Sequence, residues 1–305
     1  MMENKYLIAK SCSQAIEMSK SNPDFSYISG GTDLMINKYQ KNNISKTLID
    51  LSEITEMKNL QIKEDKVIIA CAVSLSELEK NKKINSLFPS LNKAIKSIAS
   101  PLIRNSATIG GNLLCDNRCM YYNQSEWWRE AVGNCLKCEG DICIASGGKR
   151  NCFAKMVSDL AAVLISLNAL VSVVNNDGEK IIPLEDIYSG DGIYPHSLSA
   201  ESILKEVVIP KRDSKVFFKK LRERKTLEFT SLTCAISVRD NNIRIVLGGV
   251  DPKPVVLDFD KDVTIEEIIV KSSKKCRIVK NDLYSRKYRK KMIGVFIKQG
   301  LKKIL

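Results

Sequence analysis

The segment Ile28-Ser29-Gly30-Gly31-Thr32-Asp33-Leu34 is a double-glycine turn that follows a predicted strand and precedes a predicted helix. Glycines let the main chain approach a ligand closely, and the N–H groups and dipole at the start of a helix favour a bound phosphate. We expect Thr32 or Asp33 to cap the helix that follows. One such turn is a weak indication of a ligand, because double glycines before helices are common in ordinary turns.

A second turn of the same kind, Ala107-Thr108-Ile109-Gly110-Gly111-Asn112-Leu113, offers hydroxyl, amide and backbone donors later in the chain. Neither turn is followed by the Lys-Ser/Thr pair of a Walker A loop, and neither has the Rossmann glycine spacing. The pair therefore predicts a phosphate-bearing cofactor that is bound outside those two folds.

The elements predicted around the two turns alternate between short helices and short strands, which predicts a mixed α+β protein. The hydrophobic pattern predicts an amphipathic helix over 157–167 and hairpins that turn at 175–178 and 240–242. We place a domain boundary after residue 212. It separates residues 1–212 from a smaller C-terminal unit, residues 213–305, which is also α+β.

The composition is that of a soluble globular protein, since 44% of the 305 residues are hydrophobic and 27% are charged. The N-terminus has no apolar core of signal-peptide length, and the longest apolar run, 160–174, is shorter than the roughly 20 residues that span a bilayer. We therefore expect a cytoplasmic protein that does not bind membranes. The net charge of +13 does not indicate a nucleic-acid partner, because the basic residues are spread along the whole chain.

Cysteines are concentrated in one part of the chain. In a cytoplasmic protein they are expected to be reduced thiols rather than disulfides, and clustered thiolates favour a metal or iron–sulfur site. A four-cysteine zinc site needs the same number of thiolates, but such sites usually have two C-x2-C pairs and this segment has one, Cys135 and Cys138. Six of the ten cysteines lie within 38 residues: Cys115, Cys119, Cys135, Cys138, Cys143 and Cys152.

Several motifs together resemble the FAD-binding medium subunits of the molybdenum hydroxylases, a family that includes carbon monoxide dehydrogenase and the xanthine dehydrogenases. The resemblance implies a PCMH-type FAD-binding fold of two small α+β subdomains, followed by a C-terminal α+β domain with an antiparallel sheet. It extends over most of the chain and is carried by Gly30-Gly31-Thr32-Asp33, Ile103-Arg104-Asn105-Ser106-Ala107-Thr108-Ile109-Gly110-Gly111-Asn112, Ser158-Asp159-Leu160, Leu247-Gly248-Gly249-Val250 and Tyr288-Arg289.

In that family the two glycine turns enclose the FAD pyrophosphate, and an aspartate in the position of Asp159 binds the sugar part of the cofactor. Two alternatives remain open on the residues alone: Ser158 or Asp159 could cap a helix N-terminus, and Lys220 could be a solvated strand lysine rather than a residue near the flavin. The cofactor-binding residues that the resemblance implies are Ile28, Ser29, Gly30, Gly31, Thr32, Asp33, Leu34, Thr108, Gly110, Gly111, Asn112, Asp159 and Lys220.

The cysteine-rich segment, residues 115–155, is an insertion between the second glycine turn and the Ser158-Asp159-Leu160 motif. It resembles the insertion in the flavin subunit of 4-hydroxybenzoyl-CoA reductase, which carries a [4Fe-4S] cluster. Under this resemblance Cys115 and Cys138 are not ligands, although the C-x2-C spacing of Cys138 would allow it to replace one. The iron ligands that the resemblance implies are Cys119, Cys135, Cys143 and Cys152.

The resemblance implies an electron-transfer flavoprotein subunit of a molybdenum-hydroxylase-type oxidoreductase, with FAD and a [4Fe-4S] cluster as its cofactors. It also implies a large subunit that binds molybdopterin and a small [2Fe-2S] subunit. Ferredoxin would suit as the external electron carrier. We expect no catalytic residue in this chain. Two alternatives stay open: a flavin oxidoreductase that works alone, and a zinc-bearing module that binds nucleic acid.

Overall fold

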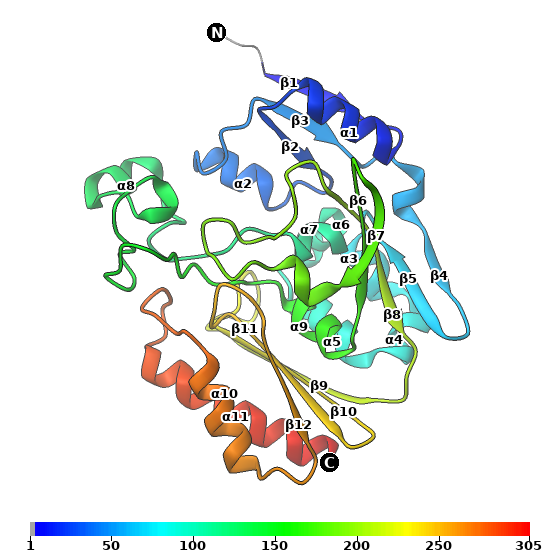
Figure 1. Cartoon of the computed structure of the whole chain (residues 1–305), viewed down its shortest axis with the longest axis vertical. Coiled ribbons are helices and arrows are strands. Elements are labelled where there is room, and N and C mark those ends of the chain that lie inside the picture. Colours follow the sequence, from blue (N-terminus) through cyan, green and yellow to red (C-terminus); the bar gives the residue numbers. More distant parts are fainter. Residues whose placement is uncertain (1–3) are drawn as a thin grey trace.

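The computed structural model describes residues 4–305. Three sheets follow one another along the molecule, with the N-terminal strands at one end and the C-terminal helices at the other (Figure 1). The mixed α+β architecture predicted from the alternation of short elements is confirmed. Among residues 4–305, no helix combines the length and the apolar character needed to cross a membrane.

The N-terminal unit contains a parallel sheet of three short strands in the order β1-β3-β2. Helix α1 connects β1 to β2 and is capped by Ser11, whose side chain accepts a hydrogen bond from the Gln14 N–H. Helix α2 begins directly after the first glycine turn. The elements are β1 (Lys5–Ile8), α1 (Cys12–Ser21), β2 (Phe25–Ile28), α2 (Leu34–Tyr39) and β3 (Thr47–Asp50).

The central unit contains an antiparallel sheet of five strands in the order β4-β5-β8-β6-β7. Strands β5 and β8 pair although the cysteine-rich segment lies between them in the chain, so this segment is an insertion into a continuous unit. The elements are η1 (Thr55–Lys58), β4 (Leu60–Ile62), β5 (Lys66–Ala70), α3 (Leu75–Lys80), α4 (Lys82–Leu87), α5 (Pro89–Ser97), α6 (Pro101–Ser106), α7 (Ile109–Leu113), α9 (Asp159–Ser166), β6 (Leu170–Asn175), β7 (Gly178–Pro183), η3 (Leu184–Ile187) and β8 (Ile203–Pro210).

The C-terminal unit is an antiparallel sheet in the order β12-β11-β10-β9, with α10 and α11 packed on one face (Figure 1). Strands β10 and β11 form the predicted hairpin, whose last pair joins Arg239 and Asn242. The elements are β9 (Lys215–Leu221), β10 (Leu232–Arg239), β11 (Asn242–Gly248), β12 (Val255–Asp260), α10 (Ile265–Lys275) and α11 (Arg286–Ile304).

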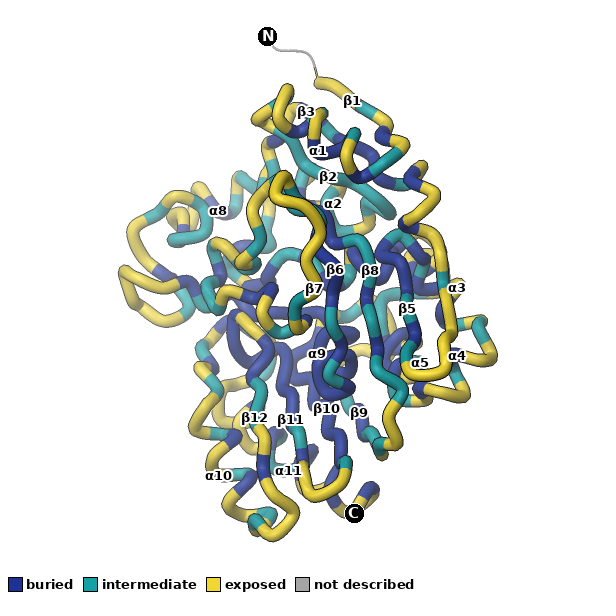
Figure 2. The backbone as a smooth tube through the Cα atoms, turned by 45° about the vertical axis from the view of Figure 1, so that its right-hand side comes forward, coloured by how far each residue is buried: buried dark blue, intermediate teal, exposed yellow. Residues whose placement is uncertain are grey.

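Strand β10 separates two hydrophobic cores. Successive side chains of a strand point to opposite faces, so Cys234 and Ile236 pack with α10 and α11, whereas Ala235 joins the core around α9. Figure 2 shows β10 and β11 buried over most of their lengths. This sheet is therefore covered on both faces.

Helix α9 lies at the centre of the molecule and contacts α5, α7, β10 and β11. All of its residues from Asp159 to Ser166 are buried. The expected amphipathic helix over 157–167 is therefore wrong in its pattern, because a helix enclosed on every side has no solvated face to carry polar residues.

The cysteine-rich segment contains α8 (Glu126–Val132) and η2 (Leu136–Cys138), and is otherwise irregular. It projects to one side of the central unit (Figure 1). Its two ends lie side by side, because Arg118 and Lys155 exchange two backbone hydrogen bonds of 2.9 and 2.8 Å. The segment is thus a closed loop on the body of the protein.

Replacing Arg289 with Met should lower the free energy of unfolding by about 3 kcal/mol or more. The fully buried Arg289 guanidinium donates to the Ser231 carbonyl and to Asn281 Oδ1, both at 3.0 Å. It also donates to the Gly249 carbonyl, and the substitution would leave these buried acceptors without partners. Urea denaturation measures the loss, and Lys290→Met on the exposed side of α11 should change stability by less than about 0.5 kcal/mol. Equal stabilities of the two variants would contradict this account.

Candidate functional site

The two glycine turns lie against each other. A Cβ added at Gly30 would lie 1.9 Å from the Ser106 carbonyl oxygen, so no larger residue fits there. Gly31 has a φ of 67°, in the left-handed region that glycine adopts without strain. The first turn is therefore held closely against the segment that leads into the second.

The second turn is shaped by the start of α7. Thr108 Oγ1 accepts a hydrogen bond from the Gly111 N–H at 3.1 Å and so caps the helix. A Cβ at Gly110 would lie 2.7 Å from the Cβ of Cys71, so the close packing against Cys71 leaves no space for a side chain at this position. A Cβ at Gly111 would meet only Thr108 Oγ1, at 3.1 Å. A side chain at Gly111 would therefore be crowded only by this one side-chain oxygen, and by no backbone atom.

Two cavities of ≈ 330 and ≈ 450 Å³ meet at these turns. Both volumes fall in the range of about 300–1,000 Å³ that is typical of ligand-binding sites. The structure brings all the predicted cofactor-binding residues to their walls. The first cavity is lined by Ile28, Ser29, Gly30, Gly31, Leu34, Thr108 and Gly110, the second by Asn112, Asp159 and Lys220, and both by Thr32, Asp33 and Gly111.

The second cavity combines apolar walls with two buried ion pairs. Its apolar side chains come from the α5–α6 region and from the loop between β9 and β10, and include Ile98, Ile103, Leu227 and Phe229. The ion pairs are Lys220 with Asp159 and Lys155 with Asp282. An apolar cavity with a few fixed polar groups suits a flat ring system that has a polar edge.

Lys220 and Asp159 form the first of these ion pairs. The Lys220 side chain is only 4% exposed, and its Nζ lies 2.5 Å from Asp159 Oδ2. Asp159 Oδ1 accepts from Thr233 Oγ1 at 2.8 Å, while α9 is capped by Ser158, which accepts from the Ala161 N–H. The alternative of a solvated lysine is therefore wrong, and of the two capping candidates Ser158, not Asp159, caps the helix.

The carboxylate of Asp33 is directed to the cysteine-rich segment. It pairs with the Arg118 guanidinium, and its Oδ2 accepts from the Asp116 N–H at 3.2 Å and from Asn37 Nδ2 at 3.2 Å. Helix α2 has no side-chain cap. Asp33 occupies the expected N-cap position, but its side chain makes no capping hydrogen bond, because the charged Arg118 is a stronger partner for the carboxylate than a free helix N–H.

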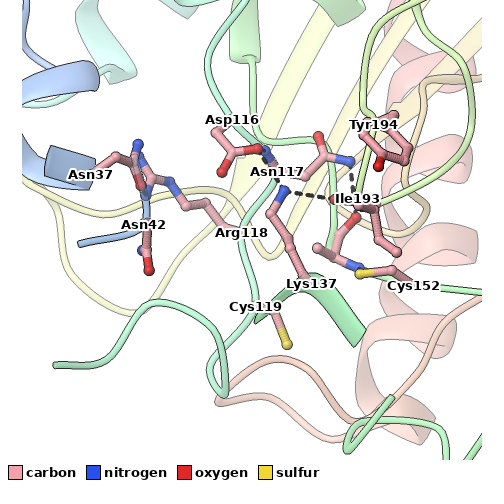
Figure 3. A network of polar contacts seen from close by, with 12 residues as sticks. Asn37, Asn42, Asp116, Asn117, Arg118, Cys119, Lys137, Cys152, Ile193 and Tyr194 are labelled. Carbon is pink, nitrogen blue, oxygen red and sulfur yellow. Dashed lines mark hydrogen bonds and ion pairs between the residues drawn. The ribbon is translucent and has the colours of Figure 1, made fainter. Parts of the chain in front are cut away.

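Lys137 provides a second link between the cysteine-rich segment and the body of the protein. Its side chain is 4% exposed, and its Nζ lies 2.6 Å from Asp116 Oδ1 and 2.6 Å from the Gly192 carbonyl oxygen. Figure 3 shows the Lys137 side chain extending towards Asp116, which precedes Arg118 and Cys119 in the chain. The ammonium also lies 4.9 Å from the centre of the Tyr122 ring. The loop is therefore anchored beside the second glycine turn.

The structure brings together the four cysteines that were predicted as ligands. They are buried, and about 10 Å³ of free space remains between them and their neighbours. Cys138 is partly exposed, and Cys115 borders the two larger cavities. The cysteine cavity is lined by Cys119, Cys135, Cys143 and Cys152, with Tyr122 among the other residues, but not by Cys115 or Cys138.

The thiols differ in their environments. Cys138 forms a hydrogen bond to Cys135 and lowers the pKa of the Cys135 thiol, whereas burial raises the pKa of Cys119. Cys119 lines the second cavity as well as the cysteine cavity. Across residues 4–305, no three Cys, His, Asp or Glu side chains are arranged around a position for a single metal ion.

Sequence reasoning missed three charged residues in the cavity walls whose side chains are less than a tenth exposed: Arg118, Lys155 and Asp282. Arg118 and Lys155 look like ordinary basic residues of the insertion, and Asp282 lies in a polar loop before α11. Neither motif nor spacing distinguishes them. Only their burial and their pairing reveal them.

Comparisons with known proteins agree with the architecture. Residues 2–212 match the family described as FAD binding domain in molybdopterin dehydrogenase. The aldehyde oxidoreductase FAD-binding subunit PaoB of Escherichia coli (strain K12) is 28% identical over 250 residues, 76% of this chain and 76% of that protein. The nicotinate dehydrogenase FAD-subunit of Eubacterium barkeri is 25% identical over 215 residues, 70% of this chain and 60% of that protein.

A solved structure supports the fold. The Cu,Mo-CO dehydrogenase in its cyanide-inactivated form superposes with a TM-score of 0.76 over 100% of this chain and 99% of that chain, at 17% identity. The expected PCMH-type fold is thereby confirmed. Because the family match covers more than half of the chain, this protein belongs to the FAD-binding subunits of the molybdenum hydroxylases.

Proposed function

We propose that the protein is an electron-transfer flavoprotein subunit that carries a [4Fe-4S] cluster close to its FAD, within a molybdenum-hydroxylase-type oxidoreductase. Family membership supports the flavin part. The observation that carries the rest is the position of Cys119, which lines both the cysteine cavity and the second large cavity. A metal group held by Cys119 would be one side chain away from a ligand in that cavity.

We assign the FAD pyrophosphate to the junction of the two large cavities. Thr32 and Gly111 border both of them, and each belongs to a glycine turn at which the main chain can approach a ligand closely. The isoalloxazine ring would take the second cavity, because apolar side chains such as Phe229 and the ammonium of Lys220 suit its two faces and its polar edge. The adenosine part would take the first cavity.

We favour a cubane cluster over a single zinc ion at these four cysteines, because four-cysteine zinc sites usually have two C-x2-C pairs and this segment has one. In a [4Fe-4S] cluster each of the four thiolates binds a different iron. The free space is small, so the side chains would swing outward on binding, and the buried Lys137 would offset part of the negative charge.

A cluster at this site would supply one-electron transfer beside the flavin. The contribution of this chain is to hold the two groups close together and to keep water from the space between them. The insertion is similar to that of 4-hydroxybenzoyl-CoA reductase, and we place the protein closest to that branch. Organic-substrate chemistry would belong to a molybdopterin-binding large subunit, with a small [2Fe-2S] subunit between and ferredoxin as an external carrier.

In this proposal residues 1–212 form the FAD-binding domain, with the iron–sulfur loop 115–155 inserted, and residues 213–305 form the C-terminal flavoprotein domain. The complex would work in the cytoplasm. No nucleic acid or membrane takes part.

Anaerobic purification of the protein from its native host should yield a coloured complex. We expect flavin absorption bands with a broad iron–sulfur shoulder and two co-purifying subunits. The iron content should exceed that of the [2Fe-2S] subunit by about four atoms per FAD. The visible spectrum, metal analysis and subunit composition of the same preparation are the measurements.

Two other outcomes would contradict the proposal. A single chain that turns over an organic substrate by itself would indicate a flavin oxidoreductase that works alone. Zinc in place of iron, together with salt-dependent binding to DNA, would indicate a nucleic-acid-binding module.

A further inference from the structure

Lys155 carries a positive charge from the cysteine-rich segment into the wall of the second cavity. It follows Cys152 by three residues, lines this cavity, and has a side chain that is 8% exposed. Its Nζ donates to the Thr230 carbonyl at 2.8 Å and to Asp282 Oδ2. An ammonium has three N–H donors, so one remains for a ligand in the cavity.

Asp282, the partner of Lys155, has its oxygens occupied by the protein. Its Oδ1 accepts from Ser231 Oγ and from the Tyr284 N–H, both at 2.9 Å, and its Oδ2 accepts from Lys155. The carboxylate therefore keeps the ammonium in place, and the ammonium is the member of the pair with a free hydrogen-bonding group. Lys220 likewise donates one hydrogen bond to the Ser97 carbonyl and one to Asp159 Oδ2, so it too has one N–H left for a ligand in the same cavity.

The residue before Asp282 joins the two ends of the cysteine-rich segment. Asn281 Nδ2 donates to the Phe153 carbonyl at 2.6 Å, and the Asn281 carbonyl accepts from the Met120 N–H at 3.4 Å. Lys155 is thus fixed by the same short loop that holds the segment closed next to Cys119. Its position in the cavity depends on the insertion and on the C-terminal unit together.

We infer that Lys155 is a positioning residue for the flavin ring, which binds the polar edge of the isoalloxazine and favours its reduced form. The inference rests on the proposed placement of this ring in the second cavity. Two-electron reduction of FAD with uptake of one proton leaves one negative charge on the ring. A buried ammonium stabilises that charge more than it stabilises the neutral oxidised ring, because the surroundings are poor in water. The electrons come from the external one-electron carrier, or from dithionite in the test below.

Lys155→Gln tests this inference, because its shorter amide side chain has two N–H donors for Thr230 and Asp282 and lacks both the charge and the third donor. We expect the dissociation constant of reduced FAD to rise at least tenfold more than that of oxidised FAD. For a two-electron couple a tenfold difference lowers the midpoint potential of the bound flavin by about 30 mV. The potential is measured by dithionite titration of the purified protein with a reference dye.

Lys205→Gln is the matched control. Lys205 also has a largely buried side chain that is paired with carboxylates, those of Glu56 and Glu179, but it lines neither of the two large cavities. Its substitution should leave the flavin potential unchanged. If Lys155→Gln does not fold, Lys155→Met removes the same charge and is read in the same way.

The inference is overturned if a folded Lys155 variant binds FAD with the wild-type potential, or if Lys205→Gln shifts the potential by as much. That result would leave the proposed function intact. Retention of FAD by Gly111→Val would instead refute the placement of the cofactor, whatever the potentials. The two failures are therefore distinguishable.

Discussion

Replacing Gly111 with valine should abolish FAD binding while leaving the protein folded. Gly111 is the member of the second glycine turn at which a side chain would be crowded only by Thr108 Oγ1, and by no backbone atom. The branched side chain would therefore enter the junction of the two cavities, where we assign the pyrophosphate. We expect FAD binding to weaken at least a hundredfold, about 2.7 kcal/mol. The measurements are the flavin-to-protein absorbance ratio after desalting and a titration of the apoprotein with FAD.

Two further glycine variants separate lost binding from lost folding. Gly111→Ala should give an intermediate affinity, because its single methyl group occupies less of the junction. Gly110→Ala should destabilise the fold, since its methyl group would lie 2.7 Å from Cys71 Cβ. Stoichiometric FAD in a folded Gly111→Val protein would show that the pyrophosphate lies elsewhere.

Each of the four proposed ligand cysteines should be necessary for the iron–sulfur cluster. Serine is a much poorer ligand for iron than a thiolate, so each single substitution should remove most of the iron and the broad visible absorbance. The proposed pyrophosphate site is not altered by these changes, so FAD should be largely retained. Iron content per chain, measured after anaerobic purification, is the test. The four variants are Cys119→Ser, Cys135→Ser, Cys143→Ser and Cys152→Ser.

Cys115→Ser and Cys138→Ser are the matched controls and should keep both iron and FAD. Cys138→Ser is the stricter test of the ligand assignment, because the Cys138 thiol is hydrogen-bonded to Cys135 although it does not line the cysteine cavity. Loss of the cluster in Cys138→Ser, with retention in one of the four ligand variants, would mean that a different set of four binds iron. Zinc at this site would rule out the cluster altogether.

The local sequence was sufficient to predict a turn or a helix start where interactions between neighbouring residues determine the backbone conformation. The hairpin between β10 and β11 was predicted from its turn, in which Asp240 adopts a left-handed φ of 48° that aspartate tolerates. The first glycine turn was predicted to precede a helix, and α2 begins directly after it, at Leu34. In both cases the atoms that stabilise the structure are a few residues apart in the chain.

Predictions from the sequence were wrong where elements distant in the chain cover the surface of a helix or strand. Helix α9 was expected to have a polar face, but α5, β10 and β11 enclose it. Lys220 could be a solvated residue by its strand pattern alone, since β9 is an edge strand with polar neighbours. The packing of α5 and α9 on that strand buries it and brings it to Asp159.

The sequence by itself determined the α+β architecture, the two glycine turns that mark the FAD-binding family, and the concentration of thiols in one insertion. Only the tertiary structure decided which charges line the second cavity. Lys155 meets a carboxylate 127 residues away, and Arg118 pairs with Asp33 across 85 residues. Backbone propensity and turn chemistry act over a few residues, whereas the partner of a buried charge depends on which distant segments pack around it.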